Sequence, residues 1–216
     1  MTEPGHNPWL DPGENVAPQP EVARPRMVST GPTQPHPGLQ AQLSGLAVSA
    51  PSPTPTQPEP PSPGVWIVGV HGGAGESTVS ELSPHFREAH HRWPQPPSYG
   101  SVLCLMVART NAAGLHNSRA AAREWAAGAQ PHVVLLGLVL IPDAPGRLPK
   151  ELARQVTLTS GGVPRVWQLP WVDDWRLHAP GYTALDTTDL PRPVKKLLVD
   201  LDELTSLNIS KENPSL

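Results

Sequence analysis

The chain has 216 residues, 30 of them proline, with one cysteine and a formal net charge of -3 at pH 7. This length allows one ordinary domain with extensions. The single cysteine excludes a disulfide framework, and the slightly acidic balance gives no direct signal for a nucleic-acid partner. No run of about 18 apolar residues suits a membrane span, and no secretory signal is visible. We therefore expect a cytoplasmic protein with no membrane partner.

Residues 1–63 alternate proline with polar residues, most densely over residues 51–63. Such a segment buries too little apolar surface to offset the entropy of ordering, so we expect a disordered Pro-rich tether. Residues 39–48 are its moderately apolar interval, interpreted as spacer, with a short partner-binding helix as the alternative. The pattern predicts a folded domain over residues 64–207 and a flexible tail over residues 208–216.

The domain opens with a short apolar run, Val65 to Val70, followed by a glycine-rich turn, His71 to Gly75. A helix-compatible stretch comes next, and this order of strand, loop and helix is that of a phosphate-binding loop. Glycines let successive backbone N–H groups form a cradle for phosphate, and a helix N-terminus adds partial positive charge. Glu76, however, stands where such a loop carries lysine.

The rest of the domain alternates predicted strands and helices. After the loop, apolar residues at helical spacing predict a helix that Pro84 kinks or divides in two. The later elements, in chain order, are strand 101–108, helix 115–127, strand 132–141, a helix from Pro149, strand 163–169 and an amphipathic helix 193–204. Strands that alternate with helices at these distances predict parallel β-α-β units and an α/β three-layer fold.

The loop resembles the deviant phosphate loop of the ParA/MinD partition-type ATPases, whose pattern is Lys-Gly-Gly-x-Gly-Lys-Ser/Thr-Thr. The matching positions are Gly72, Gly73, Gly75, Ser77 and Thr78. Both family lysines are replaced, by His71 and Glu76. Looser similarity to late strands of that family, at residues 137–141 and 163–170, extends the resemblance over about residues 64–176. The chain looks like a member of a bacterial family of degenerate P-loop proteins.

This resemblance implies an α/β/α P-loop NTPase-like domain with a mostly parallel sheet. It also implies ATP or ADP with Mg²⁺ as candidate cofactors and a protein partner or a homodimer. The candidate nucleotide-binding residues are Gly72, Gly73, Ala74, Gly75, Glu76, Ser77, Thr78 and Asp173, with Ser77 also the candidate metal ligand. Asp173 is included because the segment after the last strand lies near the adenine in that family.

The departures from the family pattern decide the expected function. A carboxylate about 4 Å from a phosphate charge costs on the order of 4 kcal/mol at an effective dielectric of 20. We therefore expect at most weak ATP or ADP binding with little or no hydrolysis, in a regulatory switch or interaction module, and assign no catalytic residue. The alternative is a scaffold or adaptor pseudo-enzyme that binds no nucleotide and recruits partners through its Pro-rich tail.

Several other residues have a structural and a functional interpretation. His71 is interpreted as a turn residue. The alternative is that a protonated His71 partly takes the place of the family lysine. Asp143 is interpreted as a turn residue rather than a magnesium-binding acid, and Cys104 as a buried core thiol rather than a nucleophile. Trp171, together with Trp167 and Trp175, is interpreted as sealing a sheet edge, with a ligand-stacking surface as the alternative. The spacing of His85, His90, His91 and Glu88 does not place two metal ligands on one helical face.

Overall fold

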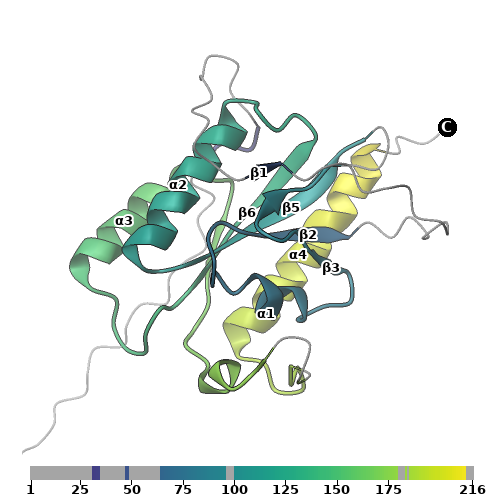
Figure 1. The fold of residues 1–216 in the computed structure, drawn as a ribbon. Coiled ribbons are helices and arrows are strands. Elements are labelled where there is room, and N and C mark those ends of the chain that lie inside the picture. Colours follow the sequence, from purple (N-terminus) through teal and green to yellow (C-terminus); the bar gives the residue numbers. More distant parts are fainter. Residues whose placement is uncertain are drawn as a thin grey trace, which may run out of the picture.

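The computed structural model describes residues 31–34, 47–48, 64–95, 100–179, 183 and 185–212. Its centre is a parallel sheet of five strands in the order β3-β2-β5-β6-β7 (Figure 1). These strands are β2 Val65–Gly69, β3 Phe86–Glu88, β5 Val102–Arg109, β6 Val133–Ile141 and β7 Val166–Gln168. A separate parallel pair joins β1, Ala47–Val48, to β4, Arg92–Trp93. The predicted α/β class with a mostly parallel sheet is confirmed.

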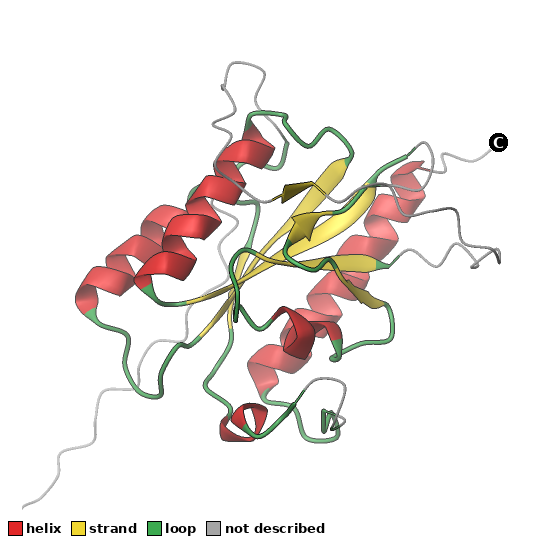
Figure 2. Ribbon diagram, viewed as in Figure 1, coloured by secondary structure: helices red, strands yellow, loops and turns green. Residues whose placement is uncertain are grey.

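Helices cover both faces of this sheet (Figure 2). They are α1 Glu76–Ser80, α2 Ala112–Ala126, α3 Lys150–Ser160 and α4 Arg192–Glu212, with a 3-10 turn, η1, at Asp173–Arg176. One apolar cluster packs α2 and α3 against the sheet, and a second cluster packs α1 and α4 against the opposite face. None of the helices in the described residues is long and apolar enough to cross a membrane.

The order of the strands creates a crevice at one edge of the sheet. From β2 the chain passes through α1 to β3 on one side of β2, and later enters β5 on the other side. The loops that follow β2 and β5 therefore leave the sheet toward opposite faces. In open parallel sheets, ligands bind at this kind of switch point, outside the carboxyl ends of the strands.

The prediction for the segment after the loop is wrong. A helix there ends at Ser80, and residues 86–88 form an edge strand that pairs with β2, Val65 opposite Phe86. Pairing with β2 satisfies backbone groups that a Pro84-broken helix would leave open. The chain then reverses through His90 and His91, whose φ angles of 54° and 58° lie in the left-handed region.

Most of the later elements lie within a few residues of their predicted bounds. The predicted helix 115–127 begins three residues earlier, where the Asn111 side chain accepts a hydrogen bond of 2.7 Å from Gly114 N. Gly128, with φ 75°, follows its end as predicted. The predicted tail 208–216 begins inside α4, which continues to Glu212. Most of the predicted disordered segment lies outside the described residues.

The predicted burial of core residues is also confirmed. Cys104 is fully buried in β5, and burial raises the pKa of its thiol far above the ordinary value, so the group is an unreactive core thiol. Helix α4 docks on its own domain through Val194, Leu197 and Leu201, all buried. Its Asp200 accepts a hydrogen bond of 2.9 Å from the indole nitrogen of Trp167, which ties the helix to β7.

Candidate functional site

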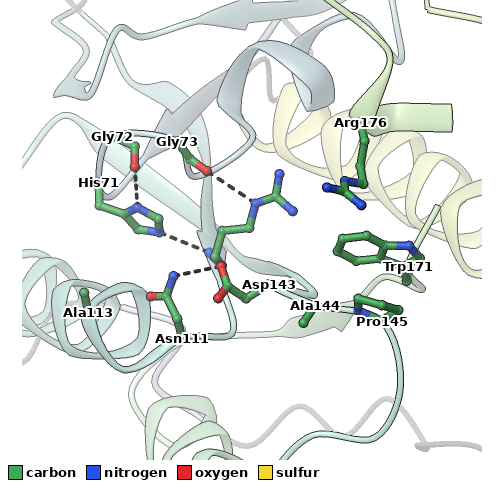
Figure 3. Close-up of a pocket in the computed structure, with 11 residues that line it drawn as sticks. His71, Gly72, Gly73, Asn111, Ala113, Asp143, Ala144, Pro145, Trp171 and Arg176 are labelled. Carbon is green, nitrogen blue, oxygen red and sulfur yellow. Dashed lines mark hydrogen bonds between the residues drawn. The ribbon is translucent and has the colours of Figure 1, made fainter. Parts of the chain in front are cut away.

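A pocket of about 710 Å³ opens at the carboxyl edge of the sheet (Figure 3). The segments that follow β2, β5, β6 and β7 all contribute to its wall. Its lining residues are His71, Gly72, Gly73, Arg109, Asn111, Ala113, Asp143, Ala144, Pro145, Trp171 and Arg176. Ligand pockets usually measure about 300–1,000 Å³, so this volume suits a small organic ligand.

The glycine loop follows β2 and forms one wall of the pocket. Gly73 and Gly75 have φ angles of 74° and 94°, which favour glycine. A Cβ atom on Gly75 would also lie 2.6 Å from Ile141 Cδ1, whereas one on Gly72 would meet open space. Among the described residues, no partner accepts a hydrogen bond from the N–H groups of Gly72, Gly73 or Gly75. The carbonyl oxygens of Gly72 and Gly73, by contrast, bond to the pocket side chains His71 and Arg109.

His71 fastens this loop to the next strand. Its Nε2 atom accepts a hydrogen bond of 3.1 Å from Arg109 N, and its Nδ1 atom lies 2.8 Å from the carbonyl oxygen of Gly72. An acceptor role for Nε2 and a donor role for Nδ1 require the neutral tautomer with hydrogen on Nδ1. The imidazole is therefore used as a structural link, which agrees with its interpretation as a turn residue.

The Glu76 carboxylate points away from the cradle and into the sheet edge. It is 2% exposed and accepts hydrogen bonds from Ala89 N at 3.0 Å and His91 N at 3.1 Å. His91 Nδ1 lies 2.8 Å from Glu76 Oε2 and 2.9 Å from Gly69 O, and with two acceptors it must carry hydrogen. Gly69 leaves room for this cluster, since a Cβ atom there would lie 2.6 Å from Oε2. Glu76 therefore serves as a structural acceptor.

Ser77 and Glu88 form a second polar pair below the loop. The Ser77 hydroxyl donates a hydrogen bond of 2.8 Å to Glu88 Oε1, which joins α1 to the end of β3. A hydroxyl and a carboxylate are oxygen ligands of the kind that Mg²⁺ prefers, and a bound Mg²⁺ usually keeps several waters. Neither residue lines the large pocket, however. In the described part of the chain, no group of three or more His, Cys, Asp or Glu side chains could hold a metal ion.

The pocket wall contains two arginines, Arg109 and Arg176. Arg109, at the end of β5, donates from Nε to Gly73 O at 3.3 Å and from a terminal nitrogen to Pro142 O at 2.8 Å. The Cζ atom of Arg176, in η1, lies 5.6 Å from the centre of the Trp171 ring, within range of a cation–π contact. Both arginines line the large pocket and a small cavity that adjoins it.

The acidic residues near the pocket are held by neighbouring donors. Asp143 Oδ1 accepts a hydrogen bond of 3.0 Å from the Asn111 side chain, which connects the loops after β5 and β6. Asp173 does not line the pocket, and its Oδ1 accepts a hydrogen bond of 2.8 Å from the Trp171 indole nitrogen. Asp143 and Asp173 therefore serve as structural acceptors at this edge.

The predicted nucleotide-binding residues divide into two groups in space. Gly72 and Gly73 line the large pocket, and Thr78 lines a small adjoining cavity that Arg109, Trp171 and Arg176 share. The remaining predicted residues line neither cavity, namely Ala74, Gly75, Glu76, Ser77 and Asp173. Sequence reasoning missed both arginines and the position of Glu88 at a strand end. The signal for Arg109 is its place directly after a buried apolar run.

Fold and pocket define a parallel α/β protein with a ligand-sized crevice at the switch point of its sheet. Residues 63–196 match a family of unknown function, DUF6668, and the chain belongs to this family. No curated protein and no solved structure matches the chain significantly.

Proposed function

We propose that this protein is a degenerate ParA/MinD-like P-loop domain that binds a nucleotide such as ATP or ADP weakly and hydrolyses little or none of it. In this proposal the domain acts as a regulatory switch or interaction module for a protein partner or a second copy. The observation that carries the proposal is the open pocket of about 710 Å³ beside the glycine loop, at the switch point of a parallel sheet.

The position of Glu76 supports binding more than the sequence alone does. Repulsion between a carboxylate and phosphate falls with distance and with screening by opposite charge. Since the Glu76 carboxylate is buried and bonded to the His91 backbone and ring, it does not occupy the cradle. Gly72 and Gly73 line the pocket and their N–H groups have no acceptor among the described residues, so these groups are candidate donors to an anion.

The residues of the same site also explain why little or no hydrolysis of the nucleotide is proposed. Phosphoryl transfer depends on positioned positive charge and on a residue that orients the nucleophile. The loop supplies no lysine, and the acid in the pocket wall, Asp143, already accepts a hydrogen bond from Asn111. Ser77, the candidate metal ligand, bonds to Glu88 and does not line the pocket, so this pair does not place Mg²⁺ beside a phosphate bound there.

One observation favours the competing proposal of a scaffold that binds no nucleotide. His71 and Glu76 tie the loop to β5 and to the β3–β4 turn. A loop kept only to connect a strand and a helix would need links of this kind. In that proposal, recruitment of partners falls to the Pro-rich segment.

A charge placed on the loop tests the nucleotide proposal. ADP and ATP would be titrated calorimetrically into the full chain, with and without Mg²⁺, and into the variants Gly72→Glu and Gly72→Gln. Neither side chain meets a neighbour within 4 Å at its Cβ atom, so both variants should fold. We expect weak binding to the natural chain and to Gly72→Gln, and a loss of about tenfold or more in Gly72→Glu through phosphate repulsion.

Equal affinity in the two variants would place the nucleotide elsewhere. An absence of ADP and ATP binding to the folded natural chain at millimolar concentration would contradict the proposal and favour the scaffold.

A further inference from the structure

Two arginines line the pocket together with one carboxylate, Asp143, which bonds to Asn111 and not to either arginine. Arg109 ends β5 and Arg176 ends η1, so segments far apart in the sequence bring them to one cavity. Within the described residues, neither guanidinium forms a salt bridge. Two unpaired cations in one open pocket attract an anion of matching charge.

Arg109 is held in place before any ligand arrives. Two of its five N–H donors bond to Gly73 O and Pro142 O, on the loops after β2 and β6. The remaining donors are free to bind a ligand in the pocket. A donor fixed by its scaffold loses less entropy on binding than a free side chain does.

Arg176 is oriented by an aromatic face instead. Its guanidinium lies over Trp171, and the Trp171 indole is itself held by its hydrogen bond to Asp173. Among the described residues, no acceptor bonds to the Arg176 side chain. All five of its donors are therefore available, which makes Trp171 a positioning residue for this cation.

We infer that Arg109 and Arg176 clamp the terminal phosphate of a phosphorylated small molecule and that this clamp needs no divalent cation. A phosphate dianion matches two guanidinium forks in charge and in planar donor geometry. Ser77 and Glu88 do not line the pocket, and the carboxylate that does, Asp143, accepts a hydrogen bond from the Asn111 side chain. The inference rests on the proposed function and adds how the phosphate is held.

The test uses the full chain and four probes: ADP, adenosine, pyrophosphate and inorganic phosphate, titrated in EDTA and in Mg²⁺. Arg176→Gln is the test variant, because Arg109 also links two loops. Arg154→Gln is the matched control, since Arg154 is exposed on α3 and does not line the pocket. We expect ADP and at least one of the two inorganic anions to bind the natural chain in EDTA. Adenosine should bind at least tenfold more weakly than ADP. The affinity of Arg176→Gln for ADP should be about tenfold lower than that of the natural chain. The control should stay within twofold of the natural chain.

The outcomes separate this inference from the nucleotide proposal. Unchanged ADP affinity in Arg176→Gln overturns the clamp and leaves the nucleotide proposal standing. Arginine-dependent binding of inorganic anions without ADP binding supports the clamp and contradicts the nucleotide proposal. Loss of binding in EDTA overturns the metal-free claim. If none of the four probes binds, both the clamp and the nucleotide proposal are overturned.

The role of Trp171 has its own readout in the same titration. Trp171→Phe keeps an aromatic face for Arg176, whereas Trp171→Ala removes it. We expect Trp171→Ala to weaken ADP binding several-fold and Trp171→Phe to restore most of it. Equal loss in both variants would instead assign the effect to the hydrogen bond with Asp173.

Discussion

Glu76 shows how the context of one residue changes the meaning of a motif position. On sequence alone, its carboxylate stands among phosphate-binding groups and should repel an anion. In the fold it is 2% exposed and accepts hydrogen bonds from two backbone N–H groups of the β3–β4 turn. Buried donors need acceptors, so the carboxylate stabilises the turn that carries His90 and His91 in the left-handed region.

Removal of this acceptor should destabilise the domain. In Glu76→Ala, His91 N loses its acceptor, whereas Ala89 N keeps its hydrogen bond to Ile67 O, and an unsatisfied group costs about 1–3 kcal/mol. We expect the free energy of unfolding in urea to fall by about 1–3 kcal/mol. Glu203→Ala, which changes an exposed carboxylate on α4, serves as the control and should alter stability by less than about 0.5 kcal/mol. A Glu76→Ala variant as stable as this control would show that the cluster is not structural.

At the scale of elements, Asp200 connects α4 to the sheet. This side chain is buried and accepts a hydrogen bond from the Trp167 indole nitrogen at 2.9 Å, while Lys196 Nζ lies 2.9 Å from its other oxygen. The helix also buries an apolar stripe, so the hydrogen bond fixes the position of a helix that apolar packing already holds.

We expect Asp200→Ala to lower the free energy of unfolding by about 1–3 kcal/mol, because the buried indole N–H then has no acceptor. Asp200→Asn keeps an acceptor oxygen and should lose less. The matched control is Asp202→Ala, an exposed acid of the same helix. Urea unfolding monitored by circular dichroism measures all three, and an equal effect of Ala at positions 200 and 202 would contradict a specific link to Trp167.

The sequence predicts those elements whose pattern is local. The long apolar runs that became β5 and β6, and the amphipathic stripe of α4, each carry their own periodicity. The short edge strand β3 has no such pattern, because it exists through pairing with β2, and helical spacing with Pro84 concealed it. Tertiary pairing overrides local propensity in segments of this kind.

The candidate site was predictable to a similar degree. The glycine loop is readable because phosphate binding needs glycines at fixed spacing, and two of its residues line the pocket. Arg109 ends β5 and Arg176 lies in η1 after β7, and only the sheet order brings them together. The direction of the Glu76 side chain also depends on a turn that lies 13 to 15 residues further along the chain.

At the scale of the whole molecule, the core lies entirely within the predicted domain. The members of both apolar clusters run from Val65 to Leu204. In the described residues, the earlier part of the chain meets the domain where β1 pairs with β4 and where Gly31 approaches Val163. These contacts involve few residues, and surface burial by the domain itself should determine its stability.

Residues 64–212 should therefore fold without the residues before them. We expect a single cooperative urea transition, a free energy of unfolding within about 1–2 kcal/mol of the full chain, and a nearly unchanged m-value, because m scales with the surface exposed on unfolding. A second shortened chain, residues 31–212, keeps both early contacts and isolates what they contribute. If residues 64–212 lose the cooperative transition while residues 31–212 retain it, the segment with β1 and Gly31 is a structural part of the domain rather than a tether.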